Sequence, residues 1–216
     1  MTRRELNRLV AQGEGLRLEF KRKARHPDKL AREIIAFANT EGGILLIGVD
    51  DNGSIYGSKT PNEDVFELEK YIKTYCRPSL QYHISYVSIT GRHTVIVFEI
   101  AKGLEKPYFV QGSSRKFTYV RVNDMSIQAS REMVQVLRHA DQSKGVSIRF
   151  GDRERTILQY LEKLPRITLD EAKEILRIPR RQASGLLILL VRAGLLNIHP
   201  SQQGDYFTLS QEAFES

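Results

Sequence analysis

The sequence of 216 residues contains a single cysteine, Cys76. This excludes an internal disulfide and a zinc site built from several cysteines, and we expect Cys76 to be a small buried hydrophobic residue. The sequence also lacks any apolar run near the roughly 18 residues that a membrane-spanning helix needs. Its first residues, MTRRELNRLV, contain no secretory hydrophobic segment. We therefore expect a cytoplasmic protein with no membrane partner.

Several signatures of chemistry are missing as well. The five histidines are scattered without the spacing of metal ligands, and no Ser-His-Asp order or nucleophile elbow is visible. No internal repeat or low-complexity tract interrupts the chain. The sequence therefore predicts no cofactor, and it does not firmly predict a metal site.

Positive charge is abundant and unevenly distributed. The formal net charge is +7. Residues 1–32 contain ten Lys or Arg against four Asp or Glu, so this segment alone carries +6. Such a concentration is typical of a nucleic-acid-binding surface, and it also fits an ordinary solvated face.

The first 140 residues alternate helical and strand patterns. Thr2 with Glu5, and Thr60 with Glu63, form capping-box patterns, each opening a helix. Apolar periodicity and turn signals predict helices at 2–13, 27–40, 60–76 and from 130, and strands at 16–21, 44–49, 54–57, 82–89, 94–100 and 116–122.

The rhythm changes after residue 151. Residues 152–163 form a helical pattern, Thr168 with Glu171 caps a second helix, and Pro179 opens a third that runs to 193. A hairpin around Gly204 follows, and three helices before a hairpin indicate a winged helix-turn-helix. We predict domains at 1–140 and 152–216, joined by a linker at 141–151.

The stretch AFANTEGGILLIGVDDNGSIYG, residues 36–57, is rich in glycine. A phosphate-binding loop leads from a strand into a helix N-terminus, whereas here a helix precedes the strand. We therefore expect Gly42 to help end the helix, Gly48 to allow a close backbone approach, and Gly53 to supply a turn.

Together, GEGLRLEFKRK, AFANTEGG, ILLIGVDDNGSIYG and KPYFVQGSSRKFTYVRVNDMSIQAS resemble the Schlafen AlbA-like domain over roughly residues 8–140. The resemblance implies an α+β fold, a mixed α/β domain that in many bacterial members is followed by a winged helix-turn-helix. It also implies nucleic-acid binding, without fixing DNA or RNA.

An acidic set is a candidate catalytic site. In Schlafen-type ribonucleases three acids bind a divalent metal, and Glu14 with Glu19 reproduces the spacing of the first two. Asp50 or Asp51 would be the third. Under this alternative, Mg²⁺ or Mn²⁺ would assist phosphodiester hydrolysis. Otherwise Glu19 pairs with a lysine and Asp51 favours the turn.

A basic set is the candidate nucleic-acid-binding site of the first domain. Alternation predicts that the side chains of Arg17, Lys21 and Lys23 share a strand face along which a phosphate backbone could lie. Tyr119 and Arg121 share another strand face, where a ring and a charge could be added, although half-buried packing is the alternative for the tyrosine. The predicted binding set is Arg17, Lys21, Arg22, Lys23 and Arg25.

The third predicted helix of the second domain is the candidate recognition helix. Arg180, Arg181, Gln182 and Ser184 lie near its start, where base edges are usually contacted. Residues 145–216 contain ten basic and nine acidic side chains, however, and the wing tip SQQGD has no Lys or Arg. A protein-interaction or dimerisation role is the alternative.

These patterns lead to one preferred function and two alternatives. We predict a DNA-binding transcriptional regulator, with DNA favoured over RNA and a homodimer as the assembly. The alternatives are a metal-dependent nuclease of Schlafen type and a protein-interaction adaptor. The sequence identifies neither the target sequence nor the signal that would be sensed.

Overall fold

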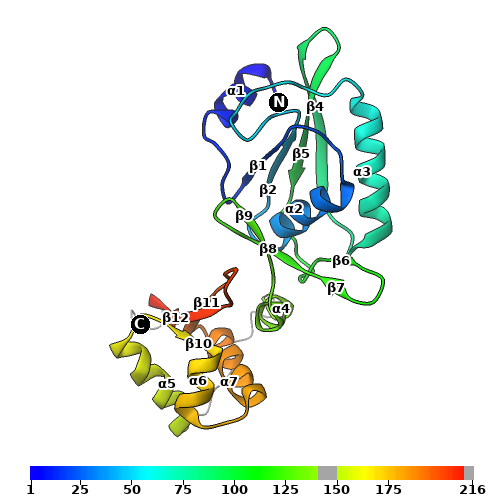
Figure 1. Ribbon diagram of the computed structural model, residues 1–216. Coiled ribbons are helices and arrows are strands. Elements are labelled where there is room, and N and C mark those ends of the chain that lie inside the picture. The colour runs from blue at the N-terminus through cyan, green and yellow to red at the C-terminus, as the bar shows by residue number, and fades with distance from the viewer. Residues whose placement is uncertain (141–149, 212–216) are drawn as a thin grey trace. The chain divides into compact units, whose positions relative to one another are not determined.

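The computed structural model describes residues 1–140 and 150–211, and the chain forms two compact units, Met1–Gln128 and Ala129–Ser216 (Figure 1). The first unit ends before the predicted boundary at residue 140, because the helix that begins after Ser130 packs within the second unit. Most of the predicted linker, residues 141–149, lies outside the described residues.

A four-stranded sheet forms the centre of the first unit. Its order is β1-β2-β5-β4, with β1 parallel to β2 and the other neighbours antiparallel. The parallel pair follows from the helical crossover between the two strands. The strands correspond to those predicted, with β1 and β2 shorter: β1 (Leu18–Lys21), β2 (Gly43–Ile47), β4 (Tyr82–Thr90) and β5 (His93–Ile100).

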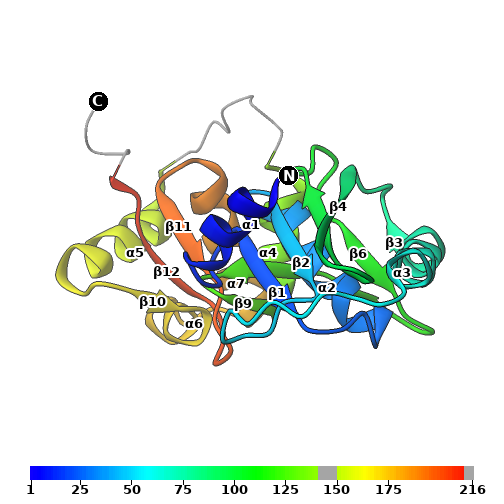
Figure 2. The same cartoon turned by 90° about the horizontal axis from the view of Figure 1, so that it is seen from above.

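Helices cover both faces of this sheet. Alternate residues of β2 point to opposite sides, so Leu45 and Ile47 pack with α2 and α3, while Leu46 packs with Leu6 of α1. Figure 2 shows α1 and α2 on opposite sides of the sheet. The helices are α1 (Arg3–Val10), α2 (Pro27–Asn39) and α3 (Pro61–Tyr75).

Smaller sheets complete the first unit. The predicted strand 116–122 is divided at Thr118 between two sheets. Cys76 is buried, as predicted, and burial raises the pKa of its thiol to about 12. The strands are β3 (Cys76–Arg77), β6 (Phe109–Gln111) and β7 (Lys116–Phe117) in one sheet, and β8 (Tyr119–Val122) and β9 (Met125–Gln128) in the other.

Two glycines of the 36–57 stretch act as predicted. Gly42 has a φ of +71° and donates its N–H to the Phe37 carbonyl at 2.9 Å, closing the end of α2. Gly48 has a φ of +106°, and a Cβ there would lie 2.7 Å from the Cα of Gly57. The strand predicted at 54–57 was wrong: Ile55 forms an isolated β-bridge with Val49, which follows β2, and no strand is formed at 54–57. The residues after β2 instead return as a loop.

Two of the three predicted helix caps are present. Thr2 and Thr168 each form a capping box with the glutamate three residues later. The Thr60 side chain makes no such bond, so the box predicted with Glu63 was wrong. The Ser58 hydroxyl instead accepts from the Thr60 N–H at 3.1 Å.

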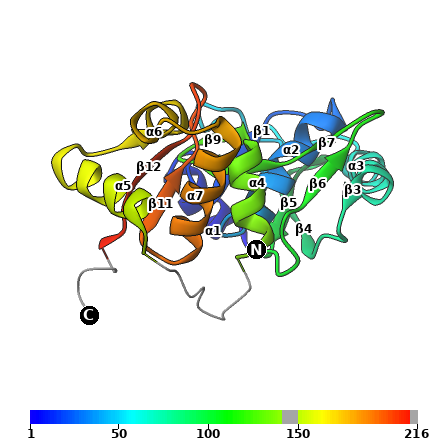
Figure 3. The same ribbon diagram turned by 90° about the horizontal axis from the view of Figure 1, so that it is seen from below.

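The second unit contains the predicted helices and hairpin, with an additional short strand. Its three-stranded sheet has the order β10-β12-β11, and α4 packs against α7 (Figure 3). In the described part of the chain, no helix is long and apolar enough to cross a membrane. The elements are α4 (Arg131–Arg138), α5 (Asp152–Lys163), β10 (Ile167–Thr168), α6 (Leu169–Leu176), α7 (Arg180–Arg192), β11 (Leu196–His199) and β12 (Tyr206–Leu209).

Candidate nucleic-acid interface

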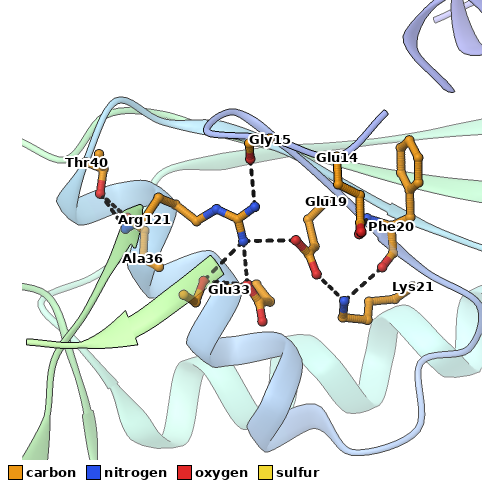
Figure 4. Close-up of polar contacts among 10 residues, drawn as sticks. Glu14, Gly15, Glu19, Phe20, Lys21, Glu33, Ala36, Thr40 and Arg121 are labelled. Atoms are coloured by element: carbon orange, nitrogen blue, oxygen red, sulfur yellow. Dashed lines mark hydrogen bonds and ion pairs between the residues drawn. The ribbon is translucent and has the colours of Figure 1, made fainter. Parts of the chain in front are cut away.

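A buried arginine connects distant parts of the first unit. The Arg121 side chain on β8 is 0% exposed, and its Nη1 donates to carboxylate oxygens of Glu19 and Glu33, both at 2.9 Å (Figure 4). Its Nη2 donates to the Gly15 carbonyl at 2.7 Å, and the guanidinium lies 4.8 Å from the Phe37 ring centre. Arg121 is therefore a structural ion-pair partner, and the suggestion that it lies on an exposed binding face was wrong.

Lys21 is drawn into the same network. Its Nζ contacts the Glu19 carboxylate and donates to the Phe20 carbonyl at 2.9 Å. Burial opposes its charge, but the hydrogen bond and charge of Glu19, with weaker effects of Glu33 and Glu14, raise the pKa of Lys21. Lys21 is consequently a charged partner of buried carboxylates.

Two of the surrounding carboxyls are held in unfavourable environments. Burial raises the pKa of Glu33, against the hydrogen bond from Ser126, and the charge of Glu19 adds to the rise. Burial also raises the pKa of Glu14, against the bond from the Phe20 N–H, and Glu19 again adds to the rise. The carboxylates therefore depend on Arg121 and Lys21 for compensation.

The predicted acidic set does not have the arrangement of a metal site. Glu19 is engaged by Arg121 and Lys21, while Asp50 forms an ion pair with Arg22 at 3.4 Å. Throughout residues 1–140 and 150–211, no three His, Cys, Asp or Glu side chains are grouped so as to hold a metal ion. Glu14, Glu19 and Asp50 or Asp51 thus do not fit Mg²⁺ or Mn²⁺ as they lie here.

The predicted basic set separates into two groups. Strand β1 ends at Lys21, so Arg17, Lys21 and Lys23 do not share one strand face, which corrects the predicted stripe. Lys21 points into the buried network, whereas Arg17 is exposed and pairs with a surface glutamate at 3.4 Å. Arg22, Lys23 and Arg25 are all exposed in the segment between β1 and α2. Arg22, Lys23 and Arg25 thus form one exposed basic segment of the first unit.

One residue predicted to contact bases is turned toward another helix. Ser184 of α7 is half-buried and donates to the Glu132 carboxylate of α4 at 2.6 Å. At the start of the same helix, Ser130 donates to Asp205, which precedes β12. Burial raises the pKa of Asp205 against this bond, and the charge of Glu132 adds to the rise. Helix α4 therefore packs on part of the α7 surface that was predicted to contact DNA bases.

The other predicted residues of α7 are exposed at its N-terminal end. Arg180 pairs with Asp170 of α6. The Gln182 side-chain oxygen accepts from Arg153 at 3.3 Å. Arg181 is exposed. Three of the four predicted residues thus lie on an accessible surface.

Sequence reasoning missed the polar residues that hold β8 against α2. The buried Asn39 donates to the carbonyls of Tyr108 and Tyr119 at 2.8 and 2.9 Å and accepts from the Tyr108 N–H at 2.8 Å. Glu33, in the middle of α2, was also missed. A polar residue inside an apolar helical run was the available signal, because such residues require buried partners.

The first unit is a mixed α/β domain with a central sheet covered by helices on both faces, stabilised by a buried ion-pair network. The family described as Schlafen, AlbA_2 matches residues 14–130, more than half of the chain. The chain therefore belongs to that family, and the resemblance seen in the sequence is confirmed. No curated protein sequence matches the chain.

Comparison with solved structures also finds two matches. One is the N-terminal domain of a RecG-related protein from Nitrosomonas europaea, with 22% identity and a TM-score of 0.45 over 58% of this chain and 92% of that one. The other is DIP2311 from Corynebacterium diphtheriae, with 20% identity and a TM-score of 0.47 over 96% of this chain. The alignment spans 38% of the length of DIP2311.

Proposed function

We propose that this protein binds nucleic acid through the exposed basic segment 22–25 and acts as a cytoplasmic DNA-binding transcriptional regulator. The observation that carries the proposal is the separation of basic residues in the first unit. Lys21 and Arg121 are used to neutralise buried carboxylates. Arg22, Lys23 and Arg25 are exposed, and Arg22 also pairs with Asp50 on the surface.

Exposed cations are suited to phosphate contact because they attract the backbone and release its counterions. Cations that neutralise buried acids would leave those acids unpaired if they moved to a phosphate. The proposal therefore assigns affinity to Arg22, Lys23 and Arg25, with Arg17 as a peripheral contact. Membership of the Schlafen AlbA_2 family and the excess of positive charge at residues 1–32 support it.

The first prediction concerns the double variant Lys23→Gln/Arg25→Gln. We expect the slope of log K against log salt for a labelled DNA duplex to become shallower by about 2, because each lost phosphate contact removes about 1. Affinity at low salt should fall similarly for unrelated sequences. Fluorescence anisotropy over a salt series measures both quantities, and an RNA duplex of equal length tests the preference for DNA.

The matched control is Lys70→Gln/Lys73→Gln, which removes the same charge from exposed positions of α3. This variant should keep the parental salt slope, with only a small loss of affinity that is similar for all DNA sequences. Equal slopes for all three proteins would contradict the assignment to residues 22–25. An absence of binding at low salt would contradict nucleic-acid binding itself.

We further propose that the second unit is a winged helix-turn-helix domain that reads sequence through the start of α7. Three helices, α5, α6 and α7, are followed by the β11–β12 hairpin, and Arg180, Arg181 and Gln182 are exposed. Arginine and glutamine side chains are suited to bidentate contacts with guanine and adenine.

Selection from a random duplex pool tests this assignment. The parent protein should enrich a defined sequence, whereas Arg180→Ala/Arg181→Ala should bind DNA but lose enrichment at the positions contacted, each good contact contributing about 1–3 kcal/mol of discrimination. Ser184→Ala should enrich the parental sequence, because Ser184 bonds Glu132. An unchanged motif in the double-arginine variant would exclude α7 as the reading element.

A protein-interaction role for the second unit is the alternative that the packing of α4 on α7 favours. A homodimer is the proposed assembly in either case. The edge strand β4 supports it, because its nine residues include no Lys, Arg, Asp, Glu or Pro that would discourage pairing with another strand. Light scattering would decide the assembly, and a monomer mass at working concentration would exclude the dimer.

A further inference from the structure

A cavity of about 500 Å³ lies in the first unit beside the basic segment 22–25. Residues 22–25, the loop 56–60, Asp64 and His93 line it. This volume is typical of a site for a small molecule or a single residue of a polymer. Neither the nucleic-acid surface proposed above nor the buried ion-pair network requires such a cavity.

The charge of the cavity favours an anion. Arg22, Lys23, Arg25 and Lys59 all line it, and all are exposed. One carboxylate, that of Asp64, also lines it and accepts a hydrogen bond from the Ser58 hydroxyl. Arg22 is paired with Asp50 at 3.4 Å, so Lys23, Arg25 and Lys59 around one engaged carboxylate supply the excess of positive charge for a phosphate group.

An aromatic ring is the second feature of the wall. Tyr56 lines the cavity and is 45% exposed. The guanidinium of Arg22 lies 4.3 Å from its ring centre, so one face of the ring carries a cation while much of the side chain stays accessible. Exposed rings beside basic side chains are platforms on which nucleic-acid bases stack.

The loop that carries the ring is fixed by the backbone. The Gly48 carbonyl accepts from the N–H groups of Tyr56 and Gly57, both at 2.8 Å, and the Ser58 N–H donates to Thr94 at 2.7 Å. The ring and the cavity wall are thus held on the end of the central sheet. Little ordering of this loop would be needed on binding.

We propose that this cavity binds one nucleotide, with its base on Tyr56 and its phosphate among Lys23, Arg25 and Lys59. The nucleotide is either an unpaired residue of a nucleic-acid strand or a free nucleotide. The strand form rests on the proposed function, because the backbone on either side would run over the basic segment 22–25. A base paired within a duplex cannot enter such a cavity without leaving the stack. The protein should consequently prefer nucleic acid with unpaired nucleotides to a blunt duplex.

The test compares blunt duplex DNA, the same duplex with a single-stranded overhang, and adenosine monophosphate, all with the full-length chain. Tyr56→Leu should lower the affinity for overhang DNA and for adenosine monophosphate by roughly five-fold or more, which is the loss expected for one stacked base. The affinity for blunt duplex DNA should stay nearly unchanged. Tyr56→Phe should retain binding because it keeps the ring. Tyr75→Leu is the matched control, since Tyr75 is 43% exposed on α3 and does not line the cavity.

Each outcome has a distinct meaning once thermal unfolding has established that the variants are folded. If Tyr56→Leu loses both the preference for overhang DNA and the binding of adenosine monophosphate, the cavity binds a nucleotide, and an unpaired residue of a nucleic-acid strand is its source. Binding of adenosine monophosphate without any DNA binding supports the cavity with a free nucleotide and overturns the proposed function. DNA binding that shows no overhang preference, together with no adenosine monophosphate binding, overturns the cavity proposal and leaves the proposed function standing.

Discussion

Replacing Arg121 by methionine is expected to lower the free energy of unfolding of the first unit by about 3–5 kcal/mol, the cost of leaving buried charges without their partner. Arg121 contacts both Glu19 and Glu33, and its side chain is 0% exposed. Methionine retains much of the apolar stem but none of the donors. Urea denaturation followed by circular dichroism measures the loss.

The matched control is Arg115→Met. Arg115 is exposed near β7, where its guanidinium lies 4.6 Å from the Phe117 ring, and its loss should cost under about 1 kcal/mol. Adding Glu19→Gln and Glu33→Gln to Arg121→Met should recover part of the stability by removing the unpaired charges. Equal losses for Arg121→Met and Arg115→Met would show that the network contributes little.

The pH dependence of the free energy of unfolding provides a second test of the Arg121→Met prediction. Burial raises the pKa of Glu33 above its unfolded value, so the folded protein binds more protons between the two values. The cost of the Glu33 charge is therefore absent below the unfolded pKa and complete above the folded pKa. Removing Arg121 raises the folded pKa further. The deficit of Arg121→Met should therefore grow as pH rises from the folded pKa of Glu33 in the parent to its higher folded pKa in the variant, and shrink on acidification.

Local patterns predicted most of the elements because the forces that define them act over a few residues. The Thr2 and Thr168 capping boxes, the glycine cap at Gly42 and the hairpin of β4 and β5 each depend on neighbours in sequence. The Thr60 cap failed for a similarly local reason, since Ser58 supplies the hydroxyl that bonds the Thr60 N–H. In a capping box this N–H would donate to the Glu63 carboxylate, so the Ser58 hydroxyl takes the place of Glu63 as its acceptor.

The candidate site was less predictable because its partners are far apart in the chain. Glu19 alternates to the polar side of its strand by pattern, yet it is 5% exposed because Arg121, 102 residues later, reaches it. The position of Ser184 near the start of α7 predicts a contact with bases, but its hydroxyl donates a hydrogen bond to Glu132 of α4. No periodicity within a single element reports such pairs. Arg22, Lys23 and Arg25 were among the predicted binding residues because composition alone marks them as basic, although the Arg22–Asp50 pair was not predicted.

Gly48→Ala should be a strongly damaging change near the cavity, although it adds only one methyl group. Gly48 has a φ of +106°, which costs a residue with a Cβ about 1–3 kcal/mol. Its Cβ would also lie 2.7 Å from the Gly57 Cα, a clash with backbone that cannot rotate away and that adds about 1–3 kcal/mol. Gly13→Ala separates the two costs, since Gly13 has a φ of +76° and open space around it.

The functional consequence should follow the same geometry. The Gly48 carbonyl accepts hydrogen bonds from the N–H groups of Tyr56 and Gly57. A Cβ at residue 48 that pushes Gly57 away should therefore displace the Tyr56 ring from the cavity wall. We expect Gly48→Ala to lose the preference for unpaired nucleotides under conditions in which thermal unfolding shows it still folded, while Gly13→Ala keeps that preference. A folded Gly48→Ala protein with parental overhang preference would mean that the close approach of these glycines stabilises the fold without positioning the Tyr56 ring.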